Sequence, residues 1–239
     1  MGQVVTFSQL PASPVADGIA SAPIKADVKE MAAELVRIAP GKRWTDIAPR
    51  GCDLYLFMLN GAAMIAAAGD ERRMPTQAFA TVQEGMEFTV NNATTAPADV
   101  VKVIAPPLDS GRSLKGFSDG LSVIERGHAP VKVLPQDHKT RLYFVDKEAA
   151  HSERAHAMIV IYDKDTLTAM HMHPDAESLF VILDGAIQFT INGKDEVVKP
   201  GQAALFGSND RHSLRAADGV TAASFLEFHI PAGYTTVYG

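Results

Sequence analysis

The sequence contains an internal repeat that constrains the fold of most of the chain. Residues 53–62 (DLYLFMLNGA) align with residues 177–186 (ESLFVILDGA). After one inserted residue, residues 75–78 (PTQA) align with residues 200–203 (PGQA). Self-similarity over such a distance predicts that one structural unit occurs twice in the chain.

Short apolar segments, separated by turn signals, fill both halves. Asn60-Gly61, Asp184-Gly185 and Asn192-Gly193 are dipeptides that favour two-residue hairpin turns. Short strands at this spacing are typical of antiparallel sandwiches and barrels. The fold class is therefore predicted as all-β.

The repeat also sets the expected domain organisation. One barrel is predicted at residues 27–106 and a second at residues 141–239. Residues 107–140 are rich in Gly, Ser, Pro, Asp and Lys and are interpreted as an ordered linker. Residues 1–26 hold several prolines and are interpreted as an irregular arm. Residues 27–38 also place apolar side chains at helical spacing, but their latter part aligns with a β-branched segment, so only the first few are expected to be helical.

Three histidines and a glutamate in the second half form a candidate metal site. His171 and His173 are two residues apart, so in a strand their side chains point to the same face. Glu177 follows a Pro-Asp turn that can return the chain to the same point, and His212 lies on a later predicted strand. An HxH pair alone is a weak signal, and a surface histidine is the commoner case. The additional downstream residues are what favour a metal here.

This ligand set indicates a class of metal. Imidazole and carboxylate groups together suit one divalent transition metal, such as Fe, Mn, Ni, Co or Zn. Four protein ligands on an octahedral ion leave two positions open, as a catalytic site requires.

The same residues resemble the motifs of the cupin superfamily. The first cupin motif, HxH(x)3–4E(x)6G, is similar to the stretch from His171 to Gly185. The second motif, a Pro-Gly followed by a strand and a histidine, is similar to the stretch from Pro200 to His212. The resemblance implies a bicupin: two tandem double-stranded β-helix barrels, with the metal inside the second.

The second half departs from the cupin pattern at the glutamate. Counted back from Gly185, the usual glutamate position is Ser178, one residue beyond Glu177. Either a one-residue bulge turns Glu177 inward, or the metal has three histidine ligands only. The bulge is the favoured alternative, because bulges often re-aim side chains near active sites.

The first half has lost the motif. Ile47 and Pro49 stand at the positions of the HxH histidines, Asp53 at that of Glu177, and Glu87 at that of the last histidine. Two carboxylates without imidazoles make a poor transition-metal site. The first barrel is therefore predicted to be a metal-free scaffold.

The resemblance implies a metal-dependent enzyme that acts on a small organic substrate with adjacent, chelating oxygens. Dioxygenase-type oxidation is the favoured reaction, but cupins also include isomerases, decarboxylases, lyases and hydrolases, and the fold does not choose among them. The alternative is a non-catalytic bicupin that binds a sugar or an organic acid.

Two residues are candidates for a catalytic role beside the metal. Arg215, three residues beyond the last ligand, can bind a substrate carboxylate through its guanidinium fork. His229 lies on the last apolar strand and is a candidate acid or base. A solvated strand end and a core histidine are the competing interpretations. Further candidates near the barrel mouth are Arg141, Tyr143 and Arg211.

Composition limits the partners that we expect. The net charge is −6 and no basic run occurs, which gives no electrostatic support for binding nucleic acid or a membrane surface. The single cysteine, Cys52, excludes an intramolecular disulfide and fits a cytoplasmic location. Exposed barrel edges and the proline-rich arm favour a homodimer.

Overall fold

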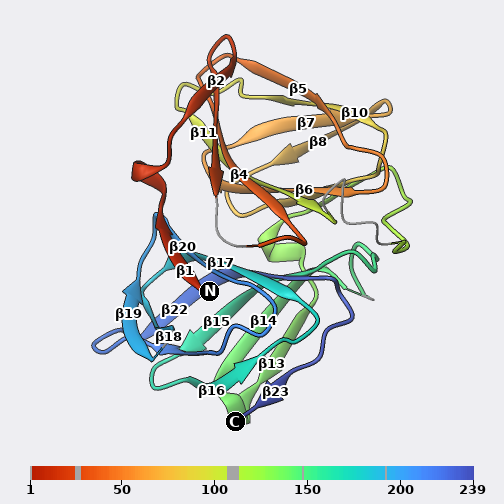
Figure 1. The fold of residues 1–239 in the computed structure, drawn as a ribbon. Helices are drawn as coiled ribbons and strands as arrows, with labels where there is room; N and C mark the ends of the chain where they lie inside the picture. Colours follow the sequence, from red (N-terminus) through yellow and green to blue (C-terminus); the bar gives the residue numbers. More distant parts are fainter. Residues whose placement is uncertain (1, 25–27, 107–112, 147, 192) are drawn as a thin grey trace.

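Two β-barrels make up the chain, the N-terminal one drawn above the C-terminal one in Figure 1. This computed structural model describes residues 2–24, 28–106, 113–146, 148–191 and 193–239. Within these ranges the helical segments are 3-10 turns at Phe7–Gln9, Arg126–His128 and Pro135–Asp137. None of the helices found in these ranges has the length and apolarity needed to cross a membrane. The all-β prediction is confirmed.

The N-terminal barrel has a large and a small sheet. Its strands are β2 (Ser13–Ala16), β3 (Ile19–Ile24), β4 (Ala32–Ile38), β5 (Arg43–Ile47), β6 (Asp53–Asn60), β7 (Ala63–Ala67), β8 (Asp70–Met74), β9 (Phe79–Val82), β10 (Glu87–Asn91), β11 (Ala98–Ala105) and β12 (Leu121–Ile124). The large sheet has the order β12-β9-β6-β11-β4-β3-β2, and the small sheet has the order β5-β10-β7-β8.

The C-terminal barrel repeats this plan. Its strands are β1 (Gln3–Thr6), β13 (Val131–Leu134), β14 (Lys139–Val145), β15 (His156–Asp163), β16 (Leu167–Met172), β17 (Glu177–Asp184), β18 (Ile187–Ile191), β19 (Lys194–Val198), β20 (Gln202–Phe206), β21 (His212–Ala216), β22 (Ala222–Ile230) and β23 (Val237–Tyr238). The large sheet has the order β1-β20-β17-β22-β15-β14-β13, and the small sheet has the order β19-β18-β21-β16-β23.

The repeat extends further than the sequence indicated. Strands β6 and β17 carry the aligned sequences and hold equivalent places, and each large sheet ends in a hairpin, β2–β3 or β13–β14. The predicted arm therefore contains strands β1 to β3, which corrects the expectation of irregular structure there, and the predicted ordered linker contains β12 and β13. The outermost strands β2 and β13 are almost entirely exposed, so they lack the alternating apolar pattern that marks a half-buried strand.

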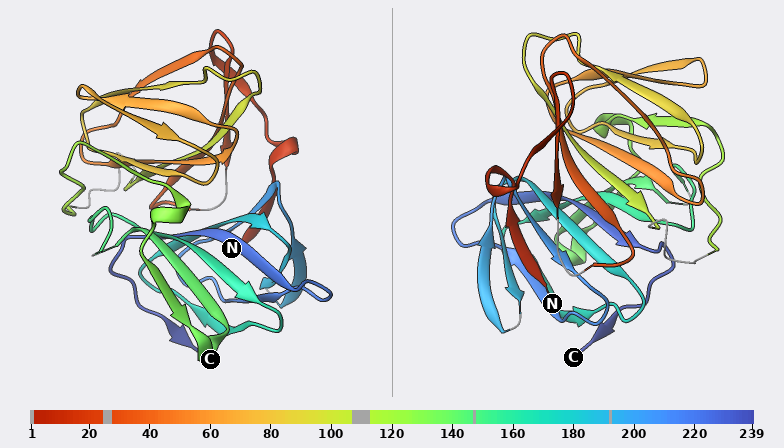
Figure 2. Two further views of the ribbon diagram at one scale, coloured as in Figure 1. Left: turned by 180° about the vertical axis from the view of Figure 1, so that it is seen from behind. Right: turned by 45° about the horizontal axis from the view of Figure 1, so that its top comes forward.

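The edge strands also tie the barrels together. Strand β1, from the start of the chain, pairs with β20 of the C-terminal barrel before the chain crosses to the N-terminal barrel. Strand β12 completes the N-terminal sheet against β9 before the chain crosses back. Both crossings can be followed in the two views of Figure 2.

Side-chain alternation along the central strands decides what points into each barrel. On β17, Phe180 and Ile182 belong to the core inside the C-terminal barrel, whereas Leu179 and Val181 belong to a core shared with the other barrel. Strand β6 alternates in the same way. The large sheets therefore pack face to face, as in a sandwich of two sheets.

Aromatic rings fill the layer between the barrels. Phe79 and Phe144, one from each barrel, stack with ring centroids 4.9 Å apart and an interplanar angle of 4°. Tyr55 and Phe228 also meet across this layer, with centroids 5.8 Å apart. Burying a large apolar side chain stabilises a protein by about 1.5–3 kcal/mol. This shared apolar layer therefore stabilises the packing of one barrel on the other.

Candidate metal centre

Two strands of the small C-terminal sheet bring three histidines together. His171 lies near the end of β16, His173 follows that strand, and His212 begins β21. His171 and His212 are direct partners in the antiparallel register. Their ring centroids lie 4.3 Å apart, and the ring of His173 is 5.1 Å from that of His171.

The three rings are oriented as metal ligands would be. One ligand nitrogen from each of His171, His173 and His212 lies within 4.8 Å of the others, and all three residues are buried. The Nδ1 atoms are 2.8, 3.0 and 2.9 Å from the backbone carbonyls of Ala169, Thr235 and Asp210, respectively. Because a carbonyl only accepts, each Nδ1 carries the proton and each Nε2 keeps its lone pair.

Burial keeps these imidazoles in the form that binds metals. Desolvation lowers the pKa of His171, of His173 to about 4 and of His212 to about 3. The Nε2 atoms of His173 and His212 are buried without a hydrogen-bond partner among the described residues. A buried polar atom without a partner is costly in a folded protein, and a metal ion would satisfy both atoms. The residues present therefore fit a divalent transition metal.

Glu177 does not join the histidines, and this corrects the predicted fourth ligand. Its carboxylate accepts hydrogen bonds from the backbone N–H groups of Lys29 and Glu30, the latter at 2.6 Å. Glu177 shares its face of β17 with Leu179, which packs between the barrels, so alternation turns it away from the metal. The expected bulge does not lie at this residue: the register shift of β17 comes between Ile182 and Asp184.

The first barrel explains why an acidic residue stands at this position in both halves. Asp53 is fully buried and accepts hydrogen bonds from Arg154, Ser152 and the backbone N–H of Phe117. Ser152 and Arg154 lie between β14 and β15 of the C-terminal barrel, just as Lys29 lies between β3 and β4 of the N-terminal one. The shared carboxylate position is therefore an anchor between the barrels.

Replacing Glu177 by glutamine distinguishes an anchor between the barrels from a metal ligand. We expect the Glu177→Gln variant to bind metal as the parent does, because the carboxylate faces away from the triad. Its free energy of unfolding should fall by about 1–3 kcal/mol, since one of the two backbone N–H groups that bind the buried Glu177 side chain loses its acceptor. Metal analysis and urea denaturation check the two halves of this prediction. Loss of metal with unchanged stability would restore Glu177 as a ligand.

The structure also contradicts the predicted role of Arg215 beside the metal. Its guanidinium lies on the surface, where it pairs with Asp218 at 2.7 Å and donates to the side chain of Gln188. Strand β21 alternates, so Leu214 faces the barrel core and Arg215 faces away. The solvated strand end was the better interpretation. Arg211 is exposed as well.

A cavity of about 250 Å³ lies against the histidines inside the barrel. His171, His173 and His229 line it, and so does the predicted candidate Arg141. Tyr143 instead lines a larger neighbouring cavity of about 690 Å³. Polar residues that the sequence analysis missed and that line the smaller cavity are Asp137, Lys139, Tyr162, Thr168, Glu227, Tyr234, Thr236 and Tyr238.

His229 belongs to a buried chain of polar groups. Its Nδ1 is 2.9 Å from the hydroxyl of Ser178, and its Nε2 is 2.7 Å from the Glu227 carboxylate. Burial raises the pKa of Glu227, but the hydrogen bond and charge of His229 and the charge of Arg141 outweigh this and hold it at about 2. Glu227 was detectable in sequence, since it precedes His229 by two residues and must share its face.

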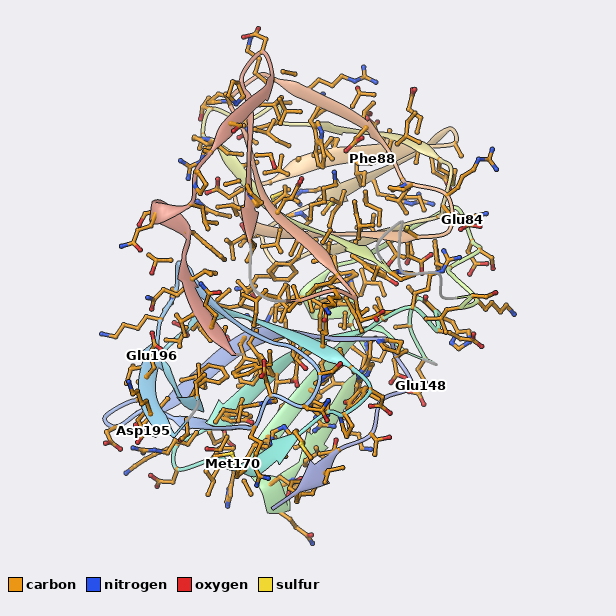
Figure 3. The ribbon with its side chains drawn as sticks, viewed as in Figure 1. Glu84, Phe88, Glu148, Met170, Asp195 and Glu196 are labelled. Atoms are coloured by element: carbon orange, nitrogen blue, oxygen red, sulfur yellow. The ribbon has the colours of Figure 1, made fainter. Side chains whose placement is uncertain are left out.

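The interior of the N-terminal barrel is apolar. Trp44 and Phe88 meet edge to face with centroids 5.2 Å apart, and Figure 3 shows Phe88 within the upper barrel. Ile47 and Glu87, which stand at two of the lost ligand positions, are exposed. Among the described residues the only group of histidines or acids placed to hold a metal is the triad of the other barrel.

Comparison with known proteins agrees with this architecture. The sequence model of the cupin domain family matches residues 158–229, and no curated protein matches the chain in sequence. The structure is similar to that of protein Ylba from E. coli, with a TM-score of 0.76 and 13% identity over 96% of this chain and 90% of that one.

Two enzymes are also among the similar structures. An oxalate decarboxylase from Lactobacillus farciminis has a TM-score of 0.73 and 12% identity, over 98% of this chain and 88% of that one. A salicylate 1,2-dioxygenase from Pseudaminobacter salicylatoxidans has a TM-score of 0.72 and 12% identity, over 96% and 84%. At such identities the likeness shows the fold alone.

The cupin match spans most of the C-terminal barrel, and the similar structures cover both barrels. The C-terminal barrel matches the cupin domain family, and the chain as a whole has the fold of two tandem all-β barrels.

Proposed function

We propose that the chain is a metal-dependent enzyme that acts on a small organic acid bound through adjacent oxygens. The observation that carries the proposal is the convergence of three buried imidazoles, two of which, His171 and His173, line a cavity. Fe, Mn, Ni, Co or Zn in the divalent state would polarise a carbonyl or stabilise negative charge on oxygen, and ferrous iron would add chemistry with dioxygen.

The charges around the cavity favour an anionic substrate. Three neutral imidazoles leave the full charge of a divalent ion uncompensated, because Glu177 points elsewhere. Lys139 and Arg141 bring further positive charge from β14, and both line the cavity. Asp137 and Glu227 are the opposing charges there, and Glu227 already accepts a hydrogen bond from His229. The divalent ion therefore leaves a net positive charge at the cavity. A carboxylate with a neighbouring hydroxyl or keto oxygen matches this field.

Arg141 is the best placed residue for binding the substrate carboxylate. Its Nε is buried and has no hydrogen-bond partner within the described part of the chain. A guanidinium can bind a carboxylate through two parallel hydrogen bonds. This role takes the place of the one that the sequence suggested for Arg215.

Replacing Arg141 should therefore weaken substrate binding more than turnover. We expect Arg141→Met to raise KM for an acidic substrate about 10- to 100-fold, since hydrogen bonds to charged groups contribute about 1.5–3 kcal/mol. Arg215→Met, which removes an exposed guanidinium, serves as the control and should leave KM unchanged. Equal effects of the two substitutions would contradict this assignment.

For the reaction itself we propose oxidation by dioxygen. Three protein ligands leave more exchangeable positions on a six-coordinate ion than four do, with room for a chelating acid and a further small reactant. The similarity in fold to a salicylate dioxygenase supports this choice, whereas the similarity to an oxalate decarboxylase keeps decarboxylation as a neighbouring outcome.

The test is to strip the protein of metal, reload it with each candidate ion, and offer hydroxy, keto and dihydroxy-aromatic acids. We expect oxygen uptake in step with loss of the acid, with iron only, and none in a His212→Ala variant. Loss of the acid without oxygen uptake would contradict oxidation and indicate decarboxylation or isomerisation instead.

One observation favours the alternative, a bicupin that binds a small acid without transforming it. The acid–base pair nearest the triad, His229 and Glu227, is engaged on both sides of the ring, so His229 has no free nitrogen to offer a substrate. This alternative predicts saturable binding of an acid to the metal-loaded protein with no turnover under any metal.

A further inference from the structure

The C-terminal residues 231–239, here called the C-terminal strap, lie across the metal cavity. Tyr234, Thr236 and Tyr238 all line it. They are spaced by two residues, so the strap runs extended with one face toward the cavity. Its last part forms β23, which pairs with β16 by placing Tyr238 opposite His171 and Val237 opposite Met172.

The strap accepts the Nδ1 hydrogen bond of one ligand of the triad, whereas the other two ligands bond to carbonyls close to them in the chain. His171 and His212 each donate from Nδ1 to a carbonyl two residues earlier in the chain. His173 donates instead to the carbonyl of Thr235, far later in the sequence. The tautomer and orientation of His173 therefore depend on where the strap lies.

A single side chain fixes that carbonyl. Asp175, two residues beyond His173, accepts hydrogen bonds from the backbone N–H of Thr235 at 2.9 Å and from its hydroxyl at 2.8 Å. Each oxygen of the Asp175 carboxylate accepts one of these two bonds, so the backbone and the side chain of Thr235 are both held. The chain thus closes a ring of contacts from His173 through Asp175 to Thr235 and back to His173.

Aromatic contacts hold the strap on its cavity side. The ring of Tyr234 stacks on His229, with centroids 4.0 Å apart and an interplanar angle of 26°. It also meets His173 edge to face at 5.0 Å. The strap therefore touches the triad through a hydrogen bond, a ring contact and a strand pairing.

We propose that the C-terminal strap is a positioning element of the metal centre, in which Asp175 and Thr235 fix the carbonyl that orients His173. This inference rests on the proposed metal site. Partners that orient histidine ligands typically account for a 10- to 100-fold change in metal affinity. Asp175 and Thr235 are positioning residues, since they act through His173.

The experiment titrates metal-free protein with Co²⁺ and follows visible absorption, which reports affinity and ligand geometry together. We expect Asp175→Ala to weaken Co²⁺ binding about tenfold and to change the spectrum. A chain ending at Tyr234 should lose up to about 100-fold. Thermal unfolding of the metal-free proteins shows whether each variant is folded.

Asp195→Ala is the matched control. Asp195 is an exposed aspartate that also accepts two hydrogen bonds, from Gln188 and Thr190. It lies on β19, on the outer side of the lower barrel in Figure 3, and should leave both affinity and spectrum unchanged.

Parental affinity and spectrum in Asp175→Ala would overturn the positioning role, whatever the truncated chain does. If His173→Ala abolished binding in the same series, the metal site itself would stand. A parent protein that fails to bind Co²⁺ would overturn both the inference and the proposed function.

Discussion

Replacing His212 by alanine should remove stoichiometric metal binding from the protein. The residue supplies one of three converging nitrogens, and its Nε2 is buried with no partner in the described chain. Since even the outer partners of metal ligands change affinity 10- to 100-fold, loss of a ligand should cost more than about 100-fold. Metal analysis after dialysis against a weak chelator measures the occupancy.

Two further variants serve as controls for this result. His212 stacks on Phe206 with centroids 4.1 Å apart, so His212→Gln, which keeps more of the side-chain volume, guards against a packing defect. His128→Ala removes an exposed histidine from a 3-10 turn and should keep full occupancy. Full occupancy in both His212 variants would show that the metal is held elsewhere.

Replacing Asp53 by alanine should destabilise the whole protein, although the residue lies in the barrel without a metal site. Asp53 is fully buried and pairs with Arg154, whose side chain is only 8% exposed. Breaking a buried ion pair on one side typically costs about 3–5 kcal/mol, because the remaining charge stays buried. Here Arg154 keeps one ion-pair partner, Glu84 at 3.0 Å, which Figure 3 labels at the edge of the molecule.

Urea denaturation of the metal-free protein measures this effect. Asp218→Ala breaks an exposed pair with Arg215 and should change stability little. A double variant, Asp53→Ala with Arg154→Met, should recover part of the loss because the buried guanidinium is removed and the carboxylate of Glu84, which loses this partner, is partly exposed. An Asp53→Ala protein as stable as its parent would show that Asp53 does not anchor the barrels.

Much of the fold was predictable because its signals are periodic. The aligned segments of β6 and β17 carry both the repeat and the strand alternation, and hairpin dipeptides mark their ends. The edge hairpins were not predictable in this way. Their residues are exposed, and backbone pairing with a neighbouring strand leaves no pattern in side chains.

The sequence predicted the candidate site only where the spacing of residues along one strand decides which way their side chains point. The spacing of His171 and His173 fixes a common face, and the structure brings His212 to it. The prediction of Glu177 as a ligand was wrong because it assumed a bulge at this residue. By strand alternation Ser178 is the residue that shares a face with Phe180. From the sequence, Arg141 was only one of several candidates near the barrel mouth. The contact of the strap residue Thr235 with His173 depends on tertiary pairing, which one sequence does not reveal. The homodimer and the cytoplasmic location stay predictions.

The central claim is that three histidines of the C-terminal barrel hold a metal without a carboxylate from the chain. Crystals of the metal-loaded protein, with diffraction recorded at the absorption edge of the metal, test it most directly. The account predicts one anomalous peak bonded to His171, His173 and His212, with Glu177 still accepting from the backbone at Lys29 and Glu30. A peak bonded to Glu177, or a principal peak in the other barrel, would contradict it.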